Sequence, residues 1–588
     1  MFQKHKTLLF LYLLLVFLLR CLYGTTIFSG EDAFQVYLIG LKWYTTGVFP
    51  YWGPDVVYTV SQIPGSLQGI LVGGPFFVIP IPEAPFLLLN LLSLIAICYL
   101  GWYFKKRIPN TPDWLLLTWL FFAPWTLGYS AHIENPSYLL FASVLFFIAI
   151  WETFPMYSER LIPTKWSFFS LGFALFWVMQ LHLSWVLMVP FIAGAFVFEY
   201  TREKSIKTEF LYFVIGALVS ASTLIPFWME FGMGEYGGTE QNIRLNLENI
   251  LKLPNIAARV ISYSCGETVH FIGSNHEERL AFLKTHLWAA AFVVVFTLLG
   301  LLQFVWQTIS LFQKRSLPEW PKVKMLFIAG IALVYLAYLF SDQPPKPHAM
   351  YLMLPLSLWY SLYCFQHWFR SRIFNIIAIV FVVSGIIFQV ALACKNSVKY
   401  GLKLKREQVI RAMERKDYTY LGLRRMSLFD ESKCIDVWNN SDPTHFTTGF
   451  EYPGLWYKPQ NITPNEHHSG KFACRMDTIM PFGSNFKKNL ALPEPIKIEY
   501  KGFIKGDYAG ELFIIFEVKS LPNHKVAFWG KVPVTTQQFN AQEWSTIETN
   551  MEIPALGSEE RELNVYFWLS STASGELFVD DISLTILP

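Results

Sequence analysis

Residues 7–34 read TLLFLYLLLVFLLRCLYGTTIFSGEDAF, and this stretch decides the fold class. Apart from Arg20, residues 7–23 are predominantly apolar over a length that lets one helix cross about 30 Å of hydrocarbon. Two adjacent carboxylates, Glu31 and Asp32, follow where the chain would leave the bilayer. Charges at a membrane surface are costly unless they are solvated, paired or used. The stretch therefore predicts a membrane-spanning helix that ends beside an acidic pair.

The composition extends this interpretation to the whole chain. Of 588 residues, 53% are apolar and only 15% are charged, against roughly 25% charged in soluble domains. This balance excludes a disordered chain and argues against a purely soluble enzyme. A net charge of +3 gives no reason to expect a nucleic-acid partner. The seven cysteines have no CxxC or Cys/His spacing, which excludes a zinc module.

Further apolar runs, bounded by charges or turn residues, recur through the first 400 residues. We predict eleven spans, at 7–23, 86–104, 114–130, 137–153, 167–181, 184–199, 209–227, 286–306, 325–341, 349–365 and 373–393. The apolar stretch 66–81 contains Gly73, Gly74 and Pro75, and we interpret it as re-entrant or interfacial. With eleven crossings every basic loop falls on one side of the membrane, which the charge rule assigns to the cytoplasm.

This topology places the N-terminus in the cytoplasm and the acidic pair outside. The segments 24–85, 131–136, 228–285 and 342–348 then lie outside, together with the tail after 394. The first span is expected to remain uncleaved, because no small-x-small site follows it. Few cysteines and short loops favour a bacterial inner membrane with a periplasmic tail.

The composition changes near residue 394, which predicts a second kind of domain. Residues 395–427 are basic and indicate an amphipathic linker helix near the membrane surface. From 428 to 588 short alternating runs separated by turns predict a β-sandwich. The expected strands include 496–500, 510–518, 525–529, 562–569 and 575–585. The fold class is thus a polytopic helical membrane domain over 1–394, followed by an all-β jelly-roll sandwich.

The outer segments collect the residues that are suited to chemistry. Each group also has a plainer interpretation. The pair Glu31-Asp32 suits the first turn of a helix. The loop with His132 and Glu134 would be an ordinary polar turn, and the group from Lys346 to Tyr351 would suit interfacial anchoring. The candidates are Glu31, Asp32, His132, Glu134, Gln180, His182, Lys346, His348 and Tyr351.

These residues together resemble the GT-C superfamily of membrane glycosyltransferases, in particular the protein O-mannosyltransferase and aminoarabinose transferase branches. The resemblance rests on Glu31-Asp32-Ala33-Phe34 with Gly47, on Glu134 within His132–Asn135, and on Lys346–Leu352. It covers roughly residues 1–400. The acidic pair is reversed relative to the family, and Ser61–Gly65 replaces its basic motif.

The resemblance implies the reaction and the partners. The donor would be a polyprenyl-phosphate-linked sugar, and the acceptor a hydroxyl of a glycan, lipid or protein. One inverting displacement would use Glu31 or Asp32 as general base, with Glu134 orienting the acceptor or a divalent cation. His132, His182, Lys346 and His348 would line the donor phosphate, and Gln180 and Tyr351 would be further substrate-binding residues. The alternative function is a transporter or flippase of lipid-linked glycans, although the spans are nearly free of acids and lack an internal repeat.

The tail resembles carbohydrate-binding modules of the jelly-roll type. The residues that carry this likeness are Phe450-Glu451, His468–Lys471 and Phe578–Leu584. In such modules an early Glu and a late Asp hold a structural calcium, which would correspond here to Glu451 and Asp581. Trp456, Trp529 and Trp568 either stack on sugar rings or pack in the core.

Overall fold

The computed structural model describes the chain apart from a set of short segments and one longer stretch. Its contacts divide the chain into two compact units, each described here by itself: Met1–Gly40 with Phe49–Arg406, and Leu41–Val48 with Glu407–Pro588. The residues left undescribed are 1–5, 57–60, 233–244, 274, 316, 342–343, 415, 417, 419–443, 451–455, 458–460, 464–465, 471–472, 479, 522–524, 535–541 and 571–573.

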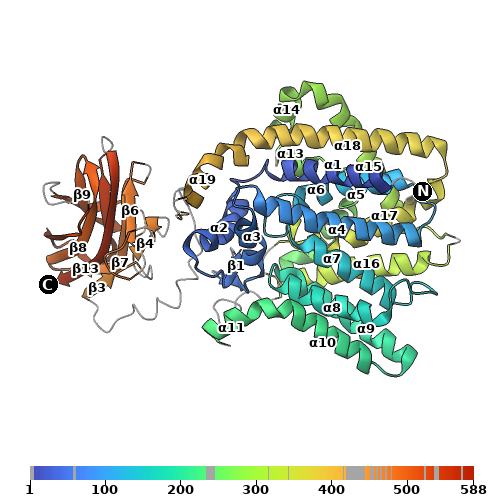
Figure 1. Cartoon of the computed structure of the whole chain (residues 1–588), viewed down its shortest axis with the longest axis horizontal. Coiled ribbons are helices and arrows are strands. Elements are labelled where there is room, and N and C mark those ends of the chain that lie inside the picture. The colour runs from blue at the N-terminus through green and yellow to red at the C-terminus, as the bar shows by residue number, and fades with distance from the viewer. Residues whose placement is uncertain are drawn as a thin grey trace. The chain divides into compact units, whose positions relative to one another are not determined.

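Helices make up most of the first unit (Figure 1). Its α-helices are α1 (Lys6–Gly24), α2 (Glu31–Thr46), whose end from Leu41 is grouped with the second unit, α3 (Leu67–Val78), α4 (Ala84–Arg107), α5 (Asp113–Phe122), α6 (Pro124–Ser130), α7 (Leu139–Thr153), α8 (Thr164–Met179), α9 (Met188–Glu203), α10 (Lys207–Ala221), α11 (Ile225–Phe231), α12 (Leu253–Ser262), α13 (Val269–Ile272), α14 (His276–Thr285), α15 (Leu287–Ser310), α16 (Trp320–Leu339), α17 (Leu354–Phe365) and α18 (Arg372–Lys399). The helix α19 (Arg406–Glu414) belongs, apart from Arg406, to the second unit. Short 3₁₀ turns are η1 (Leu183–Leu187), η2 (Ser222–Leu224), η3 (Leu247–Lys252), η4 (His348–Met353), η5 (Gln366–Trp368) and η6 (Leu402–Leu404).

Each of the eleven predicted spans coincides with helix in the structure. Among the residues that were searched, seven helices are long and apolar enough to cross a bilayer. They begin at Lys6, Ala84, Leu183, Lys207, Leu287, Trp320 and Arg372. The chain is therefore an integral membrane protein. The other four predicted spans are shorter helices, and the 114–130 span is broken at Pro124 into α5 and α6.

The stretch predicted to be re-entrant or interfacial contains the short helix α3. This helix has twelve residues, or about 18 Å of length at 1.5 Å per residue, which is too short for about 30 Å of hydrocarbon. Pro75 lies inside it, and the apolar residues at its end, Val78 and the following Ile79, are exposed. An interfacial location suits these features.

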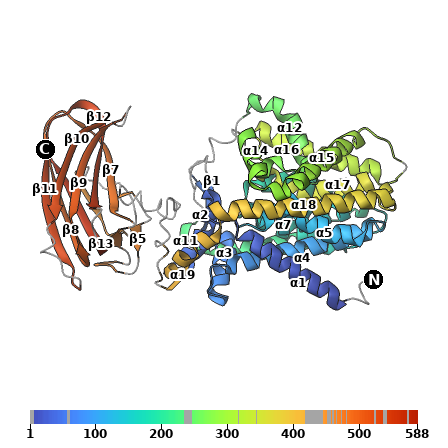
Figure 2. The ribbon, with the colours of Figure 1, turned by 90° about the horizontal axis from the view of Figure 1, so that it is seen from above.

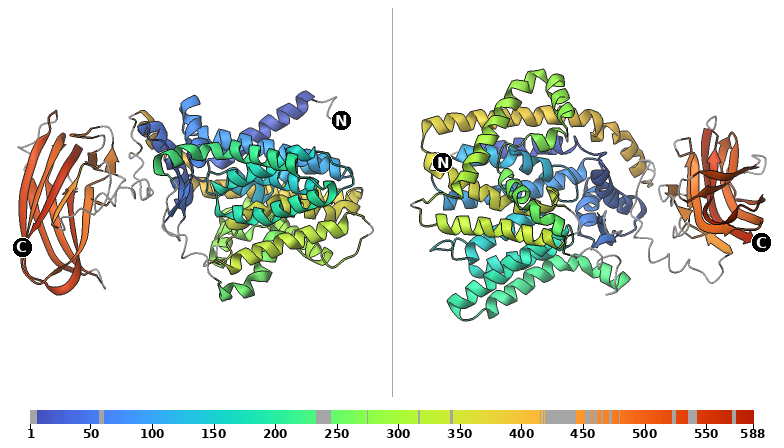
Figure 3. Two further views of the ribbon diagram at one scale, coloured as in Figure 1. Left: turned by 90° about the horizontal axis from the view of Figure 1, so that it is seen from below. Right: turned by 180° about the vertical axis from the view of Figure 1, so that it is seen from behind.

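Two glycines bring α8 and α10 into close contact, and the two helices run side by side (Figure 3). A Cβ at Gly172 would collide with the carbonyl oxygen of Phe213, and a Cβ at Gly216 would collide with that of Phe169. Small residues permit such backbone approach between helices in lipid, where van der Waals packing drives association. The longest helix, α18, packs in a different layer against α15 and α5 (Figure 2).

Buried ion pairs join helices at the end of the unit where α4, α7 and α9 finish. The carboxylate of Glu152 is buried and accepts hydrogen bonds from Arg107, the Tyr103 hydroxyl and the backbone N–H of Leu161. Glu199 on α9 is likewise buried and pairs with Arg160 and Arg202. Pairing of this kind is what allows a carboxylate to be buried.

The second unit is a two-sheet sandwich of antiparallel strands. The first sheet has the order β10-β9-β12-β7-β4 and the second β11-β8-β13-β6-β5, with β3 beside β13. Its strands are β3 (His445–Thr448), β4 (Trp456–Tyr457), β5 (Ile462–Thr463), β6 (Ala473–Asp477), β7 (Phe482–Leu492), β8 (Ile496–Ala509), β9 (Leu512–Ser520), β10 (Val526–Val534), β11 (Ser545–Ile553), β12 (Gly557–Leu569) and β13 (Ser574–Leu587). The pair β1 (Trp52–Val56) and β2 (Ser61–Pro64) belongs to the first unit.

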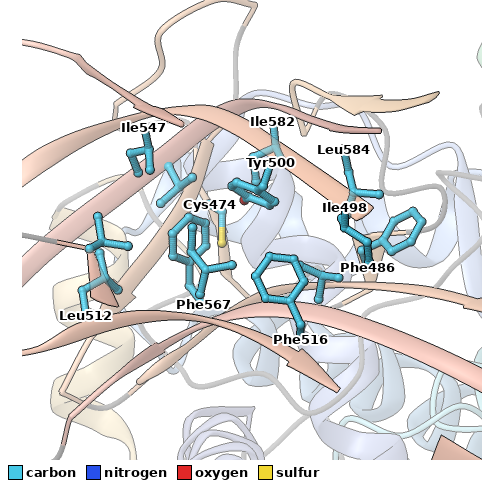
Figure 4. Packing of buried hydrophobic residues seen from close by; sticks show 14 of the residues in the cluster. Cys474, Phe486, Ile498, Tyr500, Leu512, Phe516, Ile547, Phe567, Ile582 and Leu584 are labelled. Carbon is cyan, nitrogen blue, oxygen red and sulfur yellow. The ribbon is translucent and has the colours of Figure 1, made fainter. Parts of the chain in front are cut away.

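The strand order confirms the predicted jelly roll. Strands β6 to β13 are divided between the sheets in the orders 6-13-8-11 and 7-12-9-10, and only β9 and β10 follow one another within one sheet. This is the pattern of two Greek keys. Apolar side chains from both inner faces meet between the sheets, as Figure 4 shows for Tyr500, Phe516 and Phe567. All five predicted strand segments lie within or overlap observed strands.

The helix contact at Gly216 generates a stability prediction. Gly216→Ala should lower the thermal unfolding midpoint of the protein in detergent, because the new methyl forces α8 and α10 apart, at a cost of about 1–3 kcal/mol. Gly74→Ala on α3 is the matched control, since its Cβ would meet nothing within 4 Å. Equal midpoints for the two variants would contradict the close helix contact.

Candidate functional site

Candidate residues from distant parts of the sequence meet at one end of the helical unit. The charge of Asp32 influences both Glu134 and His348. The rings of His182 and His348 lie 6.4 Å apart. The electrostatic and ring contacts therefore bring the start of α2, the loop after α6, the start of η1 and the start of η4 into one neighbourhood.

The acidic pair forms the first turn of α2. The acidic pair therefore does lie at the start of a helix, as the plainer interpretation expects. This position does not exclude a chemical role. The Asp32 side chain is exposed. Glu31 begins the helix, but its side chain lies outside the described residues. The first turn of a helix favours carboxylates because its N–H groups carry partial positive charge.

Glu134 is the second carboxylate of the site and lies in the loop between α6 and α7. The backbone N–H of Glu134 donates to the Ser137 hydroxyl at 2.8 Å, which fixes the turn. Burial, and then the negative charge of Asp32, raises the pKa of Glu134 to about 7. Near neutral pH this carboxyl can therefore both give and accept a proton.

Two of the predicted substrate-binding residues, His132 and Gln180, already have hydrogen-bond partners within the protein. His132 is buried, with Nδ1 2.8 Å from the Gly128 carbonyl oxygen and Nε2 3.3 Å from the Thr26 hydroxyl. Burial lowers the pKa of His132 to about 4, so its ring is neutral. The Gln180 amide donates to the Phe176 and Ser220 carbonyls and accepts from Thr223. Both side chains hold loops in place in this conformation.

The other predicted substrate-binding residues, His182, Lys346, His348 and Tyr351, lie in or next to η1 and η4. His182 Nδ1 accepts from the Ser184 backbone N–H, and burial, followed by the neighbouring His348, lowers the pKa of His182 to about 3. Burial also lowers the pKa of His348, while Asp32 raises it and Lys346 lowers it further. Tyr351 is buried, with its ring 5.3 Å from that of Tyr129. Because burial disfavours charge on both imidazoles, the cationic side chain of this group is that of Lys346.

The sequence analysis missed a second cation, which the outer segment 228–285 contributes. The Arg259 guanidinium pairs with Glu267 at 2.6 Å and lies 5.0 Å above the Trp125 ring. Trp125 also donates through Nε1 to Glu267 at 3.0 Å. His270 stacks on Trp125 with ring centroids 4.7 Å apart. No motif marks these residues, because they meet only when α12 and α13 pack on α6.

This second cluster adjoins the predicted one. His270 Nε2 lies 3.2 Å from the Tyr129 hydroxyl, and Tyr129 in turn contacts Tyr351. The Tyr263 hydroxyl donates to the Pro347 carbonyl at 2.6 Å, between Lys346 and His348. The described part of the site therefore combines three carboxyl groups, of Asp32, Glu134 and Glu267, with two cationic side chains, one of which, Arg259, is paired with Glu267. Several imidazoles and phenols complete it.

The described side chains, which leave out that of Glu31, do not test the metal expected at this site. Among the residues searched, no group of three or more His, Cys, Asp or Glu side chains could hold an ion. The predicted calcium of the sandwich falls partly on Glu451, which lies outside the described residues. Asp581 contacts His468 Nδ1 at 2.6 Å and accepts from the Ser469 hydroxyl at 2.7 Å. Both metal sites stay predictions.

Comparison with known proteins gives remote structural likenesses only. No protein-family model and no curated protein matches the chain. ArnT from Cupriavidus metallidurans, crystallised with undecaprenyl phosphate, has 10% identity over 67% of this chain and 78% of its own, with a TM-score of 0.40. The arabinosyltransferase EmbB from Mycobacterium smegmatis has 10% identity over 97% and 64% of the two chains, with a TM-score of 0.31.

The sandwich has likenesses of its own. The xylan-binding domain CBM22-1 of Xyn10C from Paenibacillus barcinonensis has 15% identity over 24% of this chain and 93% of its own, with a TM-score of 0.17.

The environment of Glu134 generates a titration prediction. The carboxylic acid of Glu134 should titrate near pH 7, and its pKa should fall in Asp32→Asn, because the repelling negative charge is removed. Infrared titration of the protonated carboxyl band measures this, with the band assigned by its loss in Glu134→Gln.

Asp113→Asn is the control for that titration, because Asp113 pairs with Lys105 in another part of the unit and should leave the Glu134 midpoint unchanged. A wild-type midpoint near the ordinary value of 4.5 would contradict the buried environment.

Proposed function

We propose that this chain is a membrane glycosyltransferase that moves a sugar from a polyprenyl-phosphate donor to an acceptor hydroxyl. The observation that carries the proposal is the meeting of Asp32 and Glu134 with the cations Lys346 and Arg259 at one end of a membrane helix bundle. Carboxylates are suited to take a proton from a hydroxyl, and cations to hold a phosphate.

The reaction is a single displacement with inversion. Asp32 or Glu31 accepts the proton of the acceptor hydroxyl, and the acceptor oxygen forms a bond to the anomeric carbon. The bond from that carbon to the phosphate oxygen breaks, its electron pair stays on that oxygen, and polyprenyl phosphate leaves. Exposed Asp32 is open to an acceptor that arrives from water.

The remaining groups fit supporting roles. Lys346 and Arg259 stabilise the negative charge that grows on the departing phosphate. Glu134, with its pKa near 7, holds or shares the acceptor proton and orients the acceptor hydroxyl. A divalent cation in this place stays a proposal, and no step above depends on it.

The topology proposed from basic loops places this end of the bundle outside the cytoplasm. The N-terminus is then cytoplasmic, the sandwich is extracytoplasmic, and the membrane is a bacterial inner membrane. The donor sugar would be presented from the outer leaflet, and the acceptor would be a glycan, lipid or protein on that side.

The first test is donor turnover in proteoliposomes with a panel of labelled polyprenyl-phosphate sugars. Asp32→Asn, or Glu31→Gln if that residue is the base, should lower release of polyprenyl phosphate by about 10²- to 10⁴-fold, because the general base is lost. Glu134→Gln should lower it less.

Glu203→Gln is the matched control, since Glu203 is exposed and pairs with Arg202 at the last turn of α9. Release from no donor, or full activity in all three site variants, would overturn the transferase. Movement of an intact lipid-linked glycan across the bilayer would then favour the flippase alternative.

A second function, glycan binding, is proposed for the outer face of the β10-β9-β12-β7 sheet. Phe513 and Trp568 are cross-strand partners whose rings stack 5.5 Å apart on this face. Tyr566 and Phe482 add a second ring pair at 6.1 Å, and Trp529 on β10 is about half exposed. A strip of rings across four strands suits the apolar faces of sugar rings.

Trp529→Ala should weaken binding of the full-length protein to soluble oligosaccharides roughly two- to tenfold, because one stacking surface is lost. Isothermal titration with a panel of β-linked glycans measures this. Lys501→Ala on the opposite sheet is the control. If neither change weakens binding, the proposed glycan site on this face is wrong.

A further inference from the structure

A short non-spanning segment of the outer loop exposes an unusual number of large aliphatic side chains. Residues 245–253 include η3 and the first residue of α12. Leu251 is 84% exposed, the highest value among the exposed leucines. The exposed residues of this apolar patch are Leu245, Leu247, Ile250, Leu251 and Leu253. The segment also exposes one charged side chain, that of Glu248. Large apolar side chains gathered on one exposed segment are typical of a surface that binds a protein or a membrane.

Hydrogen bonds to the end of α16 hold this apolar patch in place. The buried Asn249 side chain donates to the Tyr338 carbonyl at 2.9 Å and the Ser341 carbonyl at 3.1 Å. The Asn246 backbone N–H donates to the Leu339 carbonyl at 2.7 Å. The Leu339 carbonyl accepts from Asn246, whereas the Tyr338 carbonyl also accepts from the Ser341 backbone N–H. The segment thus adds donors at a helix end, where carbonyls lack partners within the helix.

The apolar patch continues a lipid-facing strip of α16. Met325, Ile328 and Leu336 are exposed along this membrane helix, and Phe340 is exposed just beyond its last residue. The Tyr335 hydroxyl donates to the Ile250 carbonyl at 3.1 Å, which joins the strip to the patch. Since α16 is long enough to cross the bilayer, a segment bound to its last turn lies at the level where hydrocarbon ends.

The other end of the same segment leads into the candidate site. Ile256 and Val260 on α12 are buried, whereas Arg259 pairs with Glu267 beside Trp125. Tyr263, directly after α12, donates to Pro347. One continuous piece of chain therefore connects the apolar patch to the cations of the site.

We propose that the apolar patch 245–253 inserts into the acyl-chain boundary of the leaflet next to the site and guides the hydrocarbon chain of the lipid substrate toward Arg259 and Lys346. The occupant is lipid rather than protein, because the patch is continuous with the lipid-facing strip of α16 and is fixed at its end. The guiding role rests on the proposed function, whereas the insertion does not.

The insertion is tested by photo-crosslinking in liposomes of phosphatidylethanolamine and radiolabelled phosphatidylglycerol. Full-length protein carrying benzoylphenylalanine at position 251 should form a labelled lipid adduct at a level comparable to position 325 on α16. Position 277 on the exposed face of α14 is the control and should form at least about tenfold less, since it faces water. Absence of the adduct at 251, or a crosslink to a second copy or another protein there, would overturn the insertion.

The guiding role is tested with Leu247→Asp combined with Leu251→Asp. The variant should raise KM for a long-chain polyprenyl donor by roughly tenfold, because two apolar contacts with lipid are lost. Turnover of a short-chain, detergent-soluble donor should stay unchanged.

Equal KM values for the long-chain donor in wild type and variant would overturn the guiding role, and an equal loss with both donors would indicate damage to the site itself. Wild-type protein that turns over neither donor would instead refute the proposed function, and the crosslinking result would still decide the insertion.

Discussion

Hydrocarbon offers no partner to a peptide N–H or C=O group, and this constraint shapes the helical unit. Backbone polar groups must then be satisfied within helices, so irregular chain and ionisable side chains collect at the ends of the spans. The broken helix α5–α6 and the short helix α3 are packed among other helices. Polar chemistry in such a protein is therefore expected at helix ends and in the segments between spans, which is where Asp32, Glu134 and Arg259 lie.

The two ends of the bundle use charge in different ways. Around Glu152 and Glu199, carboxylates are buried and each is held by arginine, which serves packing. At the candidate site Asp32 is exposed, while Glu134 lies in a buried setting next to it. Two carboxyl groups with different environments can divide the tasks of proton acceptor and positioning group. That contrast distinguishes a site for chemistry from a structural ion-pair network.

The sandwich follows a different physical rule from the helical unit. Alternation along β9 and β12 sends Phe516 and Val565 into the core and Phe513 and Trp568 to the outer face. Because side chains alternate strictly along a strand, the same sequence that builds the core also builds the aromatic strip. A membrane enzyme and a glycan-binding surface on one chain would act on related substrates, which is a reason to test the two functions together.

The sequence by itself determined most of the helices and strands of the protein and singled out the candidate residues that meet at one end of the helical unit. Apolar runs predict the spans, and alternation predicts the strands, because both patterns depend on near neighbours along the chain. Tertiary packing alone decided that Arg259, Glu267 and His270 join Trp125 and Tyr129 from α6. It also decided that His132 and Gln180 are held by backbone groups. Such partners are separated by up to about 140 residues and leave no local pattern, so only the packed fold can bring them together.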